Sequence, residues 1–260
     1  MMAGADIAGT TEDAFLGGRL TVEQTLTGSR AGIDAVFLAA ACPAKAGETV
    51  LELGAGSGVV ALAIAARVEG VRVTGIEIDS ELSALAARNA ERNGLGDRAH
   101  FICGDVAAPL SRLIDARLKP DSFDHAVANP PFLSHGETRL PADEKLRRAH
   151  ALRPGELEKW VRSLAAFVRP GGTATIVHRA DALPDLLKHC AGRFGGLTVF
   201  PLFPREGETA SRVLVQGIKG SRAALRLLPG MILHDEGHTF TSEAQAILRH
   251  GAGLDVRTGK

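Results

Sequence analysis

Residues 52–58 (Glu-Leu-Gly-Ala-Gly-Ser-Gly) place three glycines between a segment that predicts a buried strand, 49–53, and one that predicts a helix, 59–67. Glycines at this spacing let the chain turn sharply and let a ligand approach the backbone closely. Unpaired N–H groups in the first turn of the helix then face that ligand. A strand, a glycine turn and a helix in this order indicate a parallel α/β sheet, in which ligands bind beyond the carboxyl ends of the strands.

The alternation of apolar strands and helices continues along most of the chain. Further strands are expected at 71–78, 99–103, 123–128, 173–178, 197–200 and 213–218. Further helices are expected at 33–41, 81–93, 111–118, 155–168 and 182–190. This order predicts an α/β fold with a doubly wound, mostly parallel seven-stranded sheet and helices on both faces.

Three stretches of unequal character make up the expected domain organisation. Residues 1–30 predict an N-terminal extension with a loose start over 1–13 and a hairpin around Gly17-Gly18. Residues 31–218 carry the alternating strands and helices of the main domain. Residues 219–260 predict a C-terminal extension of the same domain, with a strand, a turn and a helix.

Composition excludes several classes of protein. The 30 basic and 30 acidic residues cancel, which excludes a protein that holds nucleic acid by bulk charge. The longest apolar run, Ile33 to Cys42, is interrupted by Asp34 and is shorter than the roughly 20 residues that cross a bilayer. The N-terminal stretch has no Lys or Arg, unlike a signal peptide, and three scattered cysteines form no disulfide or zinc pattern. We therefore expect a cytoplasmic protein with no metal and no membrane contact.

Acidic residues follow two further strands at the same predicted edge of the sheet. Glu77 lies 23 positions after Gly54, where a carboxylate can accept both ribose hydroxyls of a nucleoside. Asp105 follows the third strand and can accept a hydrogen bond from an adenine amino group. The glycine turn lacks the Lys-Ser or Lys-Thr of a phosphate-binding loop, and Val59 replaces the last glycine of dinucleotide sites. The pattern predicts a nucleoside without a phosphate tail, with Glu52 facing an amino group on that tail.

The segment Asn129-Pro130-Pro131-Phe132 follows the fourth strand of the predicted sheet. Two prolines fix φ at successive residues and remove two donors, so the turn is stiff and its carbonyls remain available as acceptors. The Asn129 oxygen and the Pro130 carbonyl can each accept one N–H of a planar amino group, while Phe132 stacks on the attached ring. Such acceptors aim the nitrogen lone pair and stabilise the positive charge that develops when the nitrogen takes up a methyl group.

These motifs resemble the class I S-adenosylmethionine-dependent methyltransferases over residues 30–218, and Asn129 to Phe132 resembles their (D/N)-P-P-(Y/F) amino-methyltransferase signature. The resemblance implies S-adenosylmethionine as the cofactor. The catalytic residues that it implies are Asn129, Pro130, Pro131 and Phe132. The cofactor-binding residues that it implies are Glu52, Gly54, Ala55, Gly56, Gly58, Glu77, Ile78, Asp105, Val106 and Asn129.

Enzymes with this signature methylate either amines of nucleic-acid bases or the glutamine amide of translation release factors. The glutamine enzymes usually carry a helical domain before the glycine loop, whereas about 50 residues precede it here, which favours a base. Residues 28–35 and 233–248 resemble bacterial tRNA (adenine-N6) methyltransferases that modify valine tRNA. This resemblance implies N6 of adenine in tRNA as the target.

A basic stretch after the diproline motif supports an RNA partner. Lys145, Arg147 and Arg148 lie close together and can follow a phosphate backbone, so we interpret them, with Phe132, as substrate-binding residues. Two alternatives stay open: methylation of a release-factor glutamine, and an RNA-binding module of the same fold without catalysis. The sequence leaves the oligomeric state open.

Overall fold

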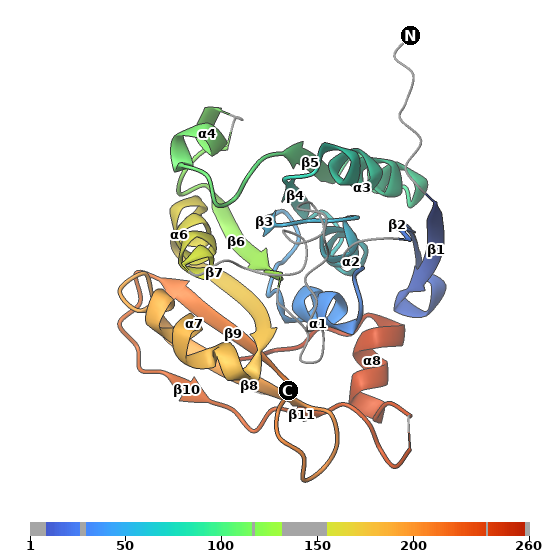
Figure 1. Ribbon diagram of the computed structural model, residues 1–260, viewed down its shortest axis with the longest axis vertical. Helices are drawn as coiled ribbons and strands as arrows, with labels where there is room; N and C mark the ends of the chain where they lie inside the picture. Colours follow the sequence, from blue (N-terminus) through green and yellow to red (C-terminus); the bar gives the residue numbers. More distant parts are fainter. Residues whose placement is uncertain (1–8, 27–29, 116–117, 132–154, 238, 258–260) are drawn as a thin grey trace.

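The computed structural model describes residues 9–26, 30–115, 118–131, 155–237 and 239–257. These residues form one large sheet with helices on both faces (Figure 1). The strand order is β10-β8-β9-β7-β6-β3-β4-β5, and β11 pairs with β8. The bounds are β3 Thr49–Leu53, β4 Arg72–Glu77, β5 Ala99–Cys103, β6 Phe123–Ala128, β7 Val168–Arg179, β8 Phe194–Phe203, β9 Arg212–Lys219, β10 Arg226–Leu227 and β11 Met231–Ile232.

Strand pairing in this sheet is mostly parallel. Strand β9 runs antiparallel to both of its neighbours, β7 and β8, and the pairs from β7 through β6, β3 and β4 to β5 are parallel. The predicted doubly wound α/β fold is therefore confirmed. The seven expected strands are β3 to β9, and the two-residue strands β10 and β11 extend the sheet beyond them.

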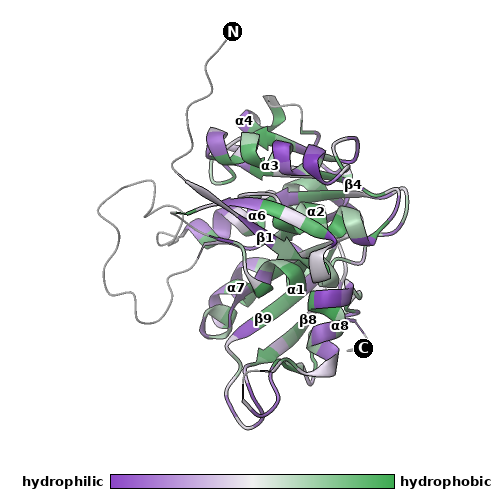
Figure 2. Ribbon diagram, turned by 90° about the vertical axis from the view of Figure 1, so that its right-hand side faces the viewer, coloured by the Kyte–Doolittle hydropathy of each residue, from purple (hydrophilic) through white to green (hydrophobic). Residues whose placement is uncertain are grey.

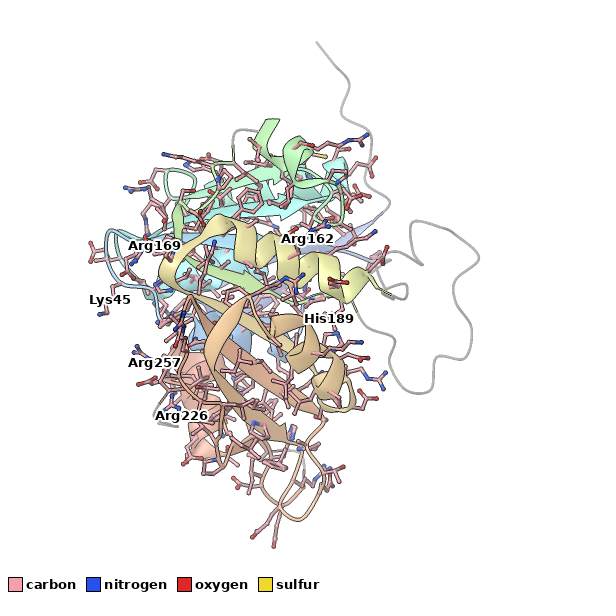
Figure 3. The ribbon with its side chains drawn as sticks, turned by 90° about the vertical axis from the view of Figure 1, so that its left-hand side faces the viewer. Lys45, Arg162, Arg169, His189, Arg226 and Arg257 are labelled. Carbon is pink, nitrogen blue, oxygen red and sulfur yellow. The ribbon has the colours of Figure 1, made fainter. Side chains whose placement is uncertain are left out.

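Two layers of helices enclose the sheet. In Figure 1, α1, α2 and α3 lie on one side of the sheet, and α4, α6 and α7 lie on the other. Figure 3 looks onto the second layer, with Arg162 on α6 and His189 on α7. The bounds are α1 Ile33–Ala41, α2 Val59–Arg67, α3 Ser80–Arg92, α4 Leu110–Asp115, α6 Glu156–Phe167 and α7 Leu183–Cys190.

The two faces of the sheet bury two apolar clusters. Val50, Val127 and Val177 pack with α1 and α2, whereas Leu51 and Ile176 pack with α6 and α7. Side chains alternate along each strand, so both faces of the central strands are apolar, as expected of a sheet covered on two sides. Figure 2 shows this hydrophobic interior, in green, between helices with hydrophilic outer surfaces.

The N-terminal hairpin consists of β1 (Thr10–Phe15) and β2 (Leu20–Thr25), joined by the short 3-10 turn η1 (Leu16–Gly18). A hairpin around Gly17-Gly18 was expected, but a loose start through residue 13 is wrong, because β1 begins at Thr10. Tertiary contacts order this polar strand. Arg92 of α3 bonds to Glu12, and Arg30 bonds to Asp13.

Two asparagines, Asn89 in α3 and Asn93 at its C-cap, attach the hairpin to the domain. The Asn93 side chain accepts from the Thr21 N–H at 3.0 Å and donates to the Thr21 carbonyl at 2.8 Å. The Asn89 side chain makes the same pair of bonds with the backbone of Glu23, both at 2.9 Å. The two amides therefore pair with β2 as the backbone of a neighbouring strand would, and they satisfy an edge that would otherwise be exposed.

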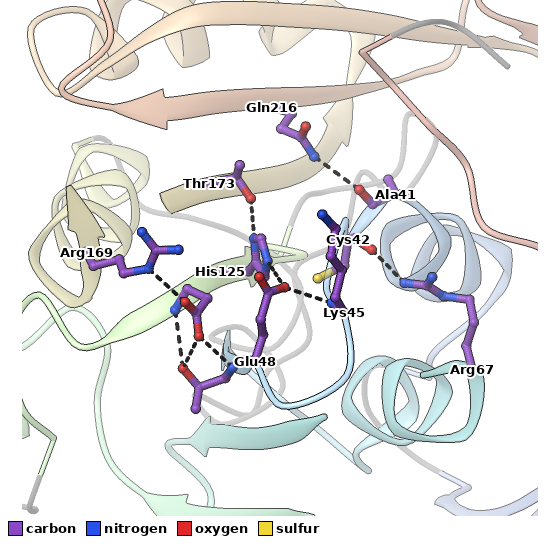
Figure 4. A network of polar contacts seen from close by, with 11 residues as sticks. Ala41, Cys42, Lys45, Glu48, Arg67, His125, Arg169, Thr173 and Gln216 are labelled. Carbon is purple, nitrogen blue, oxygen red and sulfur yellow. Dashed lines mark hydrogen bonds and ion pairs between the residues drawn. The ribbon is translucent and has the colours of Figure 1, made fainter. Parts of the chain in front are cut away.

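A polar network closes the amino ends of β3, β6 and β7 (Figure 4). The two ring nitrogens of His125 contact Thr173 Oγ1 at 2.7 Å and Glu48 Oε2 at 2.9 Å. Asp124 accepts from the Thr49 N–H at 2.8 Å and from Arg169 Nε at 2.7 Å. These groups stabilise the edge opposite to the one where the glycine turn lies.

The C-terminal residues pack along β8 and α1. After β11, an isolated bridge joins His234 to Phe240, and α8 (Ser242–His250) follows with Thr241 as its N-cap. The rings of His234 and Phe240 stack with centroids 4.5 Å apart. The described residues contain no group of three or more His, Cys, Asp or Glu placed to share a metal ion. None of the helices in the described ranges is long and apolar enough to cross a membrane.

Candidate active site

The glycine turn lies between β3 and α2 at the carboxyl edge of the sheet. Gly54, Gly56 and Gly58 all have left-handed backbone angles, with φ of +72°, +53° and +89°. Gly54 and Ala55 both donate to the Ile76 carbonyl on β4, at 2.8 and 2.9 Å. The turn is thereby fixed to the neighbouring strand. Residues with a Cβ adopt these angles only at a cost, which explains the three glycines.

The three glycines differ in the space that a side chain would have. A Cβ on Gly58 would come within 2.9 Å of the Phe101 ring, and one on Gly54 within 2.5 Å of the Trp160 ring. A Cβ on Gly56 would meet no described atom within 4 Å. The backbone of Gly56 is therefore open on one side, as required where a ligand approaches the loop.

The carboxylate of Glu77 lies beside this open backbone. It accepts from the Gly56 N–H at 2.8 Å and from the Asp79 N–H at 3.0 Å. Burial raises the pKa of Glu77, although the hydrogen bonds from the backbone oppose the change. Each carboxylate oxygen has a second lone pair, so ribose hydroxyls can bond to Glu77 while the loop keeps its contacts.

Glu52 belongs to β3, and its side chain reaches the first turn of α2. Its Oε2 accepts from the Ala61 N–H at 2.9 Å, and the residue is 2% exposed. Burial raises the pKa of Glu52 well above its ordinary value, and the nearby charge of Glu77 adds to the increase. The side chain thus caps an orphan N–H of the first helical turn.

Residues that follow β4 and β5 lie at the same carboxyl edge of the sheet as Glu77. Ile78 is 48% exposed, an unusual position for a large apolar side chain beside polar groups. Asp105 is exposed and accepts from the Ala107 N–H at 2.8 Å, while Val106 is buried and its carbonyl accepts from Ser163. An apolar surface next to an exposed acceptor fits a purine ring with its amino group.

The diproline turn begins directly after β6, beside the glycine turn. Leu53 pairs with Ala128, so Gly54 and Asn129, the next residues after β3 and β6, lie next to each other. Asn129 Oδ1 is buried and has no hydrogen-bond partner among the described residues. Pro130 is buried and Pro131 is half-buried. Phe132, Lys145, Arg147 and Arg148 lie outside the described residues.

Sequence reasoning missed a buried network behind the glycine turn. Gln24 of the hairpin accepts from the Ala31 N–H at 2.8 Å and from Ser57 Oγ at 3.3 Å. Asn89 donates to the Ser57 carbonyl at 3.0 Å. The turn is therefore held from the hairpin and from α3 as well as from β4. The sequence shows two asparagines four residues apart in the predicted helix 81–93, but it does not indicate which residues they bind.

Two further residues lie near the site. Asp34 of α1 forms an ion pair with Arg212 of β9, with Arg212 Nε 2.8 Å from Asp34 Oδ2. Trp160 is a buried residue of α6, and its ring lies against Gly54. Helix α6 therefore contributes directly to the shape of the glycine turn.

The open backbone at Gly56, the acceptors at Glu77 and Asp105 and the orphaned oxygen of Asn129 together fit S-adenosylmethionine and an amino group beside it. Enzymes that bind this cofactor at the edge of such a sheet are the class I methyltransferases, and this chain is one of them. More narrowly, it belongs to the methyltransferase small domain family, whose family model matches residues 28–181.

Curated relatives divide between two target classes. The chain is 25% identical over 244 residues to the tRNA1(Val) (adenine(37)-N6)-methyltransferase of Shewanella halifaxensis, which covers 92% of this chain and 89% of the relative. It is 31% identical to the protein of the same name from Porphyromonas gingivalis, over 69% of this chain and 70% of the relative. A release factor glutamine methyltransferase of Chlorobaculum tepidum is 30% identical over 59% of this chain and 45% of the relative.

Among solved structures, a predicted O-methyltransferase from Agrobacterium tumefaciens is similar along most of its length. The TM-score is 0.73 and the identity 29%, over 85% of this chain and 98% of that protein. An S-adenosylmethionine-dependent O-methyltransferase from Thermotoga maritima shares the fold, with a TM-score of 0.53 at 17% identity over 75% of this chain and 68% of that protein.

Proposed function

We propose that this enzyme transfers a methyl group to an exocyclic amino nitrogen, and that its substrate is N6 of adenine in a tRNA. The observation that carries the proposal is the buried, unpartnered Oδ1 of Asn129 at the carboxyl end of β6. A buried acceptor without a partner costs free energy, about 1–3 kcal/mol. A substrate N–H group removes that cost when it binds.

The nature of this acceptor favours nitrogen over oxygen as the methylated atom. An amide oxygen accepts hydrogen bonds. A planar NH₂ group carries two N–H donors, so it can bond to this oxygen and to a second acceptor. The second acceptor in our proposal is the carbonyl of Pro130, and Phe132 stacks on the ring of the base. Positive charge that develops on the nitrogen is stabilised by these fixed dipoles, by roughly 3–4 kcal/mol for one well-placed group.

We propose the following roles for the residues at the carboxyl edge. Glu77 binds the ribose hydroxyls of the cofactor, Asp105 and the Val106 backbone bind its adenine, and Ile78 packs on the ring. Gly54, Ala55, Gly56 and Gly58 form the wall beside its methionine part, and Glu52 fixes the first turn of α2 behind them. When bound, the cofactor supplies an electrophilic methyl group, and Asn129 holds the acceptor nitrogen in line with it.

Support for tRNA as the substrate comes from relatives that span most of this chain. The valine-tRNA enzyme of Shewanella halifaxensis covers 92% of it, whereas the glutamine enzyme of Chlorobaculum tepidum covers 59%. We therefore propose a tRNA partner, contacted in part by Lys145, Arg147 and Arg148, and a cytoplasmic reaction. We also propose that 31–218 are the methyltransferase domain, with 1–30 and 219–260 as its extensions.

Calorimetry and a transfer assay on two variants test the proposal. Asn129→Ala should bind S-adenosylmethionine with unchanged affinity and lose transfer by at least 100-fold, because it removes an acceptor that acts on the substrate. Asn129→Asp keeps an acceptor oxygen and should retain part of the transfer. Asn93→Ala, at the C-cap of α3, also removes a side-chain amide and is the matched control, which should leave transfer per folded enzyme unchanged.

Two outcomes would contradict the proposal. If the wild-type protein does not bind S-adenosylmethionine, the site assignment fails. If labelled methyl groups appear on a release-factor glutamine and not on tRNA, the cofactor site stands and the alternative substrate replaces adenine.

A further inference from the structure

A buried serine of α6 is bonded to the turn that follows β5. Ser163 is 0% exposed, and its Oγ donates to the Val106 carbonyl at 2.8 Å. A serine inside a helix more often bonds to the carbonyl one turn earlier in the same helix. Alanine favours a helix more than serine does. Helix stability therefore does not account for a serine here, whose hydroxyl bonds across the interface between α6 and the turn.

The turn from Asp105 to Ala108 is closed by its own hydrogen bonds. The Ala108 N–H donates to the Asp105 carbonyl at 3.1 Å, and the Ala107 N–H donates to Asp105 Oδ1 at 2.8 Å. An aspartate that bonds to the N–H two residues further on forms an Asx turn. Just before the turn, the Gly104 N–H donates to the Glu77 carbonyl at 2.8 Å. The turn is thus attached to the carboxyl end of β4.

A single peptide group joins the serine to the aspartate. The Val106 carbonyl and the Ala107 N–H belong to the same planar peptide unit. Its oxygen accepts from Ser163, and its N–H donates to Asp105 Oδ1. Hydrogen bonds in series polarise one another, so a donor on the carbonyl strengthens the N–H as a donor. Ser163 therefore fixes the plane of the peptide to which the Asp105 carboxylate is bonded.

The second oxygen of this carboxylate is available to a ligand. Asp105 is exposed, and its Oδ2 has no hydrogen-bond partner among the residues that the structure describes. Because Oδ1 is held by the Ala107 N–H, the direction in which Oδ2 points is set by the same peptide. An ionised carboxylate only accepts hydrogen bonds, so this oxygen fits an amino group and not a carbonyl group.

Helix α6 contacts the site at a second point on the same face. The ring of Trp160, three residues before Ser163, lies against Gly54. Residues three apart on a helix share a face. Arg162 Nη2 also donates to the Ala108 carbonyl at 3.4 Å. The helix thus supports both the glycine turn and the turn after β5, which are the two ends of the proposed cofactor site.

We propose that Ser163 is a positioning residue for adenine recognition: through the peptide between Val106 and Ala107, it orients the Asp105 carboxylate toward the 6-amino group of the cofactor. This inference rests on the proposed function, because it deepens the assignment of Asp105 to the adenine. Ser163 is buried behind the peptide, so it acts through Asp105 and not by contact with the cofactor. The hydroxyl thereby favours adenine over a purine without the amino group.

Two ligands that differ only in this amino group provide the direct test. They are S-adenosylhomocysteine and its analogue with an unsubstituted purine in place of adenine, and calorimetry measures the Kd of each. Wild-type protein should bind S-adenosylhomocysteine at least tenfold more tightly than the analogue. Ser163→Ala should weaken S-adenosylhomocysteine at least fivefold and change the Kd of the analogue less than twofold. A merely structural role would weaken both ligands by the same factor.

Further variants assign the effect to Asp105. Asp105→Ala should remove the preference for adenine, and Ser163→Ala added to it should change the Kd of S-adenosylhomocysteine less than twofold, because both substitutions act on the same contact. Ser163→Thr keeps the hydroxyl and should keep the preference. Ser122→Ala is the matched control: its hydroxyl donates to the Lys119 carbonyl at 2.6 Å, before the amino end of β6, and its loss should leave both Kd values unchanged.

The outcomes distinguish failure of this inference from failure of the proposed function. If wild-type protein binds neither ligand, the cofactor site of the proposed function is wrong. If it binds both equally, or if Ser163→Ala weakens both by the same factor, the positioning role is wrong while the cofactor site stands. The choice between tRNA and protein as methyl acceptor does not affect these measurements, because they follow cofactor binding alone.

Discussion

The indole ring of Trp160 lies against Gly54, so helix α6 and the glycine turn share a surface. A Cβ added to Gly54 would come within 2.5 Å of Trp160 Cη2, and Gly54 has a φ of +72°. Glycine is therefore required twice at this position, for its backbone angle and for the close approach of the ring. Because α6 forms one wall of the turn, changes in the turn should be detectable at Trp160.

Replacing Gly54 should test this contact against backbone strain alone. Gly54→Ala should lower the free energy of unfolding by about 2–4 kcal/mol, from the left-handed angle and from overpacking against the ring. Gly18 has a similar φ, and a Cβ there would meet no described atom within 4 Å, so Gly18→Ala should cost only about 1–2 kcal/mol. Chemical denaturation of both variants measures the difference. Equal losses would show that the contact with Trp160 is unimportant.

Gly56→Ala should separate binding from stability. Its Cβ meets no described atom, so the loss of stability should match that of Gly18→Ala. The added methyl group would occupy the space in which we propose the cofactor, and the S-adenosylmethionine affinity should fall at least tenfold. Calorimetry that finds the wild-type affinity in Gly56→Ala would place the cofactor elsewhere.

Trp160 should report cofactor binding through its fluorescence. The chain has one tryptophan and no tyrosine, so the emission excited at the tryptophan band comes from this residue. Adding S-adenosylmethionine should change the emission along a saturable curve whose Kd agrees with calorimetry. Glu77→Ala, which removes the ribose acceptor, should abolish the change. An unaltered emission from wild-type protein that binds the cofactor would argue against contact between α6 and the site.

Cys103 should react with a maleimide, and the cofactor should protect it. Burial raises the pKa of Cys42 to about 11 and of Cys190 to about 12, so both remain thiols at neutral pH. Cys103 is exposed at the end of β5, and its Sγ lies 3.6 Å from the Ile78 carbonyl. Intact-protein mass spectrometry should find one modification, slowed at least tenfold by S-adenosylmethionine and absent from Cys103→Ser. Equal rates with and without the cofactor would contradict the adenosine position.

Asp124 should make the fold more stable at neutral than at acidic pH. Burial alone would raise its pKa, but the hydrogen bonds from Thr49 and Arg169 outweigh burial and lower the pKa below 3.8. The folded state therefore binds the proton less tightly than the unfolded chain, and stability is lost as the pH falls through the folded pKa. Asp124→Asn should cost about 1–2 kcal/mol at pH 7. The stabilities of variant and wild type should converge as the pH falls below the ordinary pKa of an aspartate, and a constant gap would refute this role.

Local patterns were sufficient to predict the sheet and the glycine turn. The glycines at 54, 56 and 58 and the apolar strands around them act within a few residues, so their spacing indicates their structure directly. The acid at Glu77 could be placed for the same reason, because strand order brings the carboxyl ends of β3 and β4 together. These assignments depend on periodicity and turn chemistry and need no distant contact.

Contacts between distant parts of the chain could not be predicted in this way. Asn89 and Asn93 appear as polar residues of an amphipathic helix, and their partners on β2 lie 66 and 72 positions away. Arg179 and Arg212 become opposed only through the register of β7 and β9. The polar strand β1 has no apolar alternation to reveal it, and its order comes from ion pairs with Arg30 and Arg92.

The central claim is methyl transfer to adenine N6 at Asn129, and nucleoside mass spectrometry tests it most directly. Purified enzyme, S-adenosylmethionine labelled in its methyl group and unmodified valine tRNA should yield one labelled N6-methyladenosine per tRNA, and Asn129→Ala should yield none. The account would be contradicted if wild-type enzyme bound the cofactor yet left every adenosine of the tRNA unlabelled, or if Asn129→Ala produced the same nucleoside at the wild-type rate.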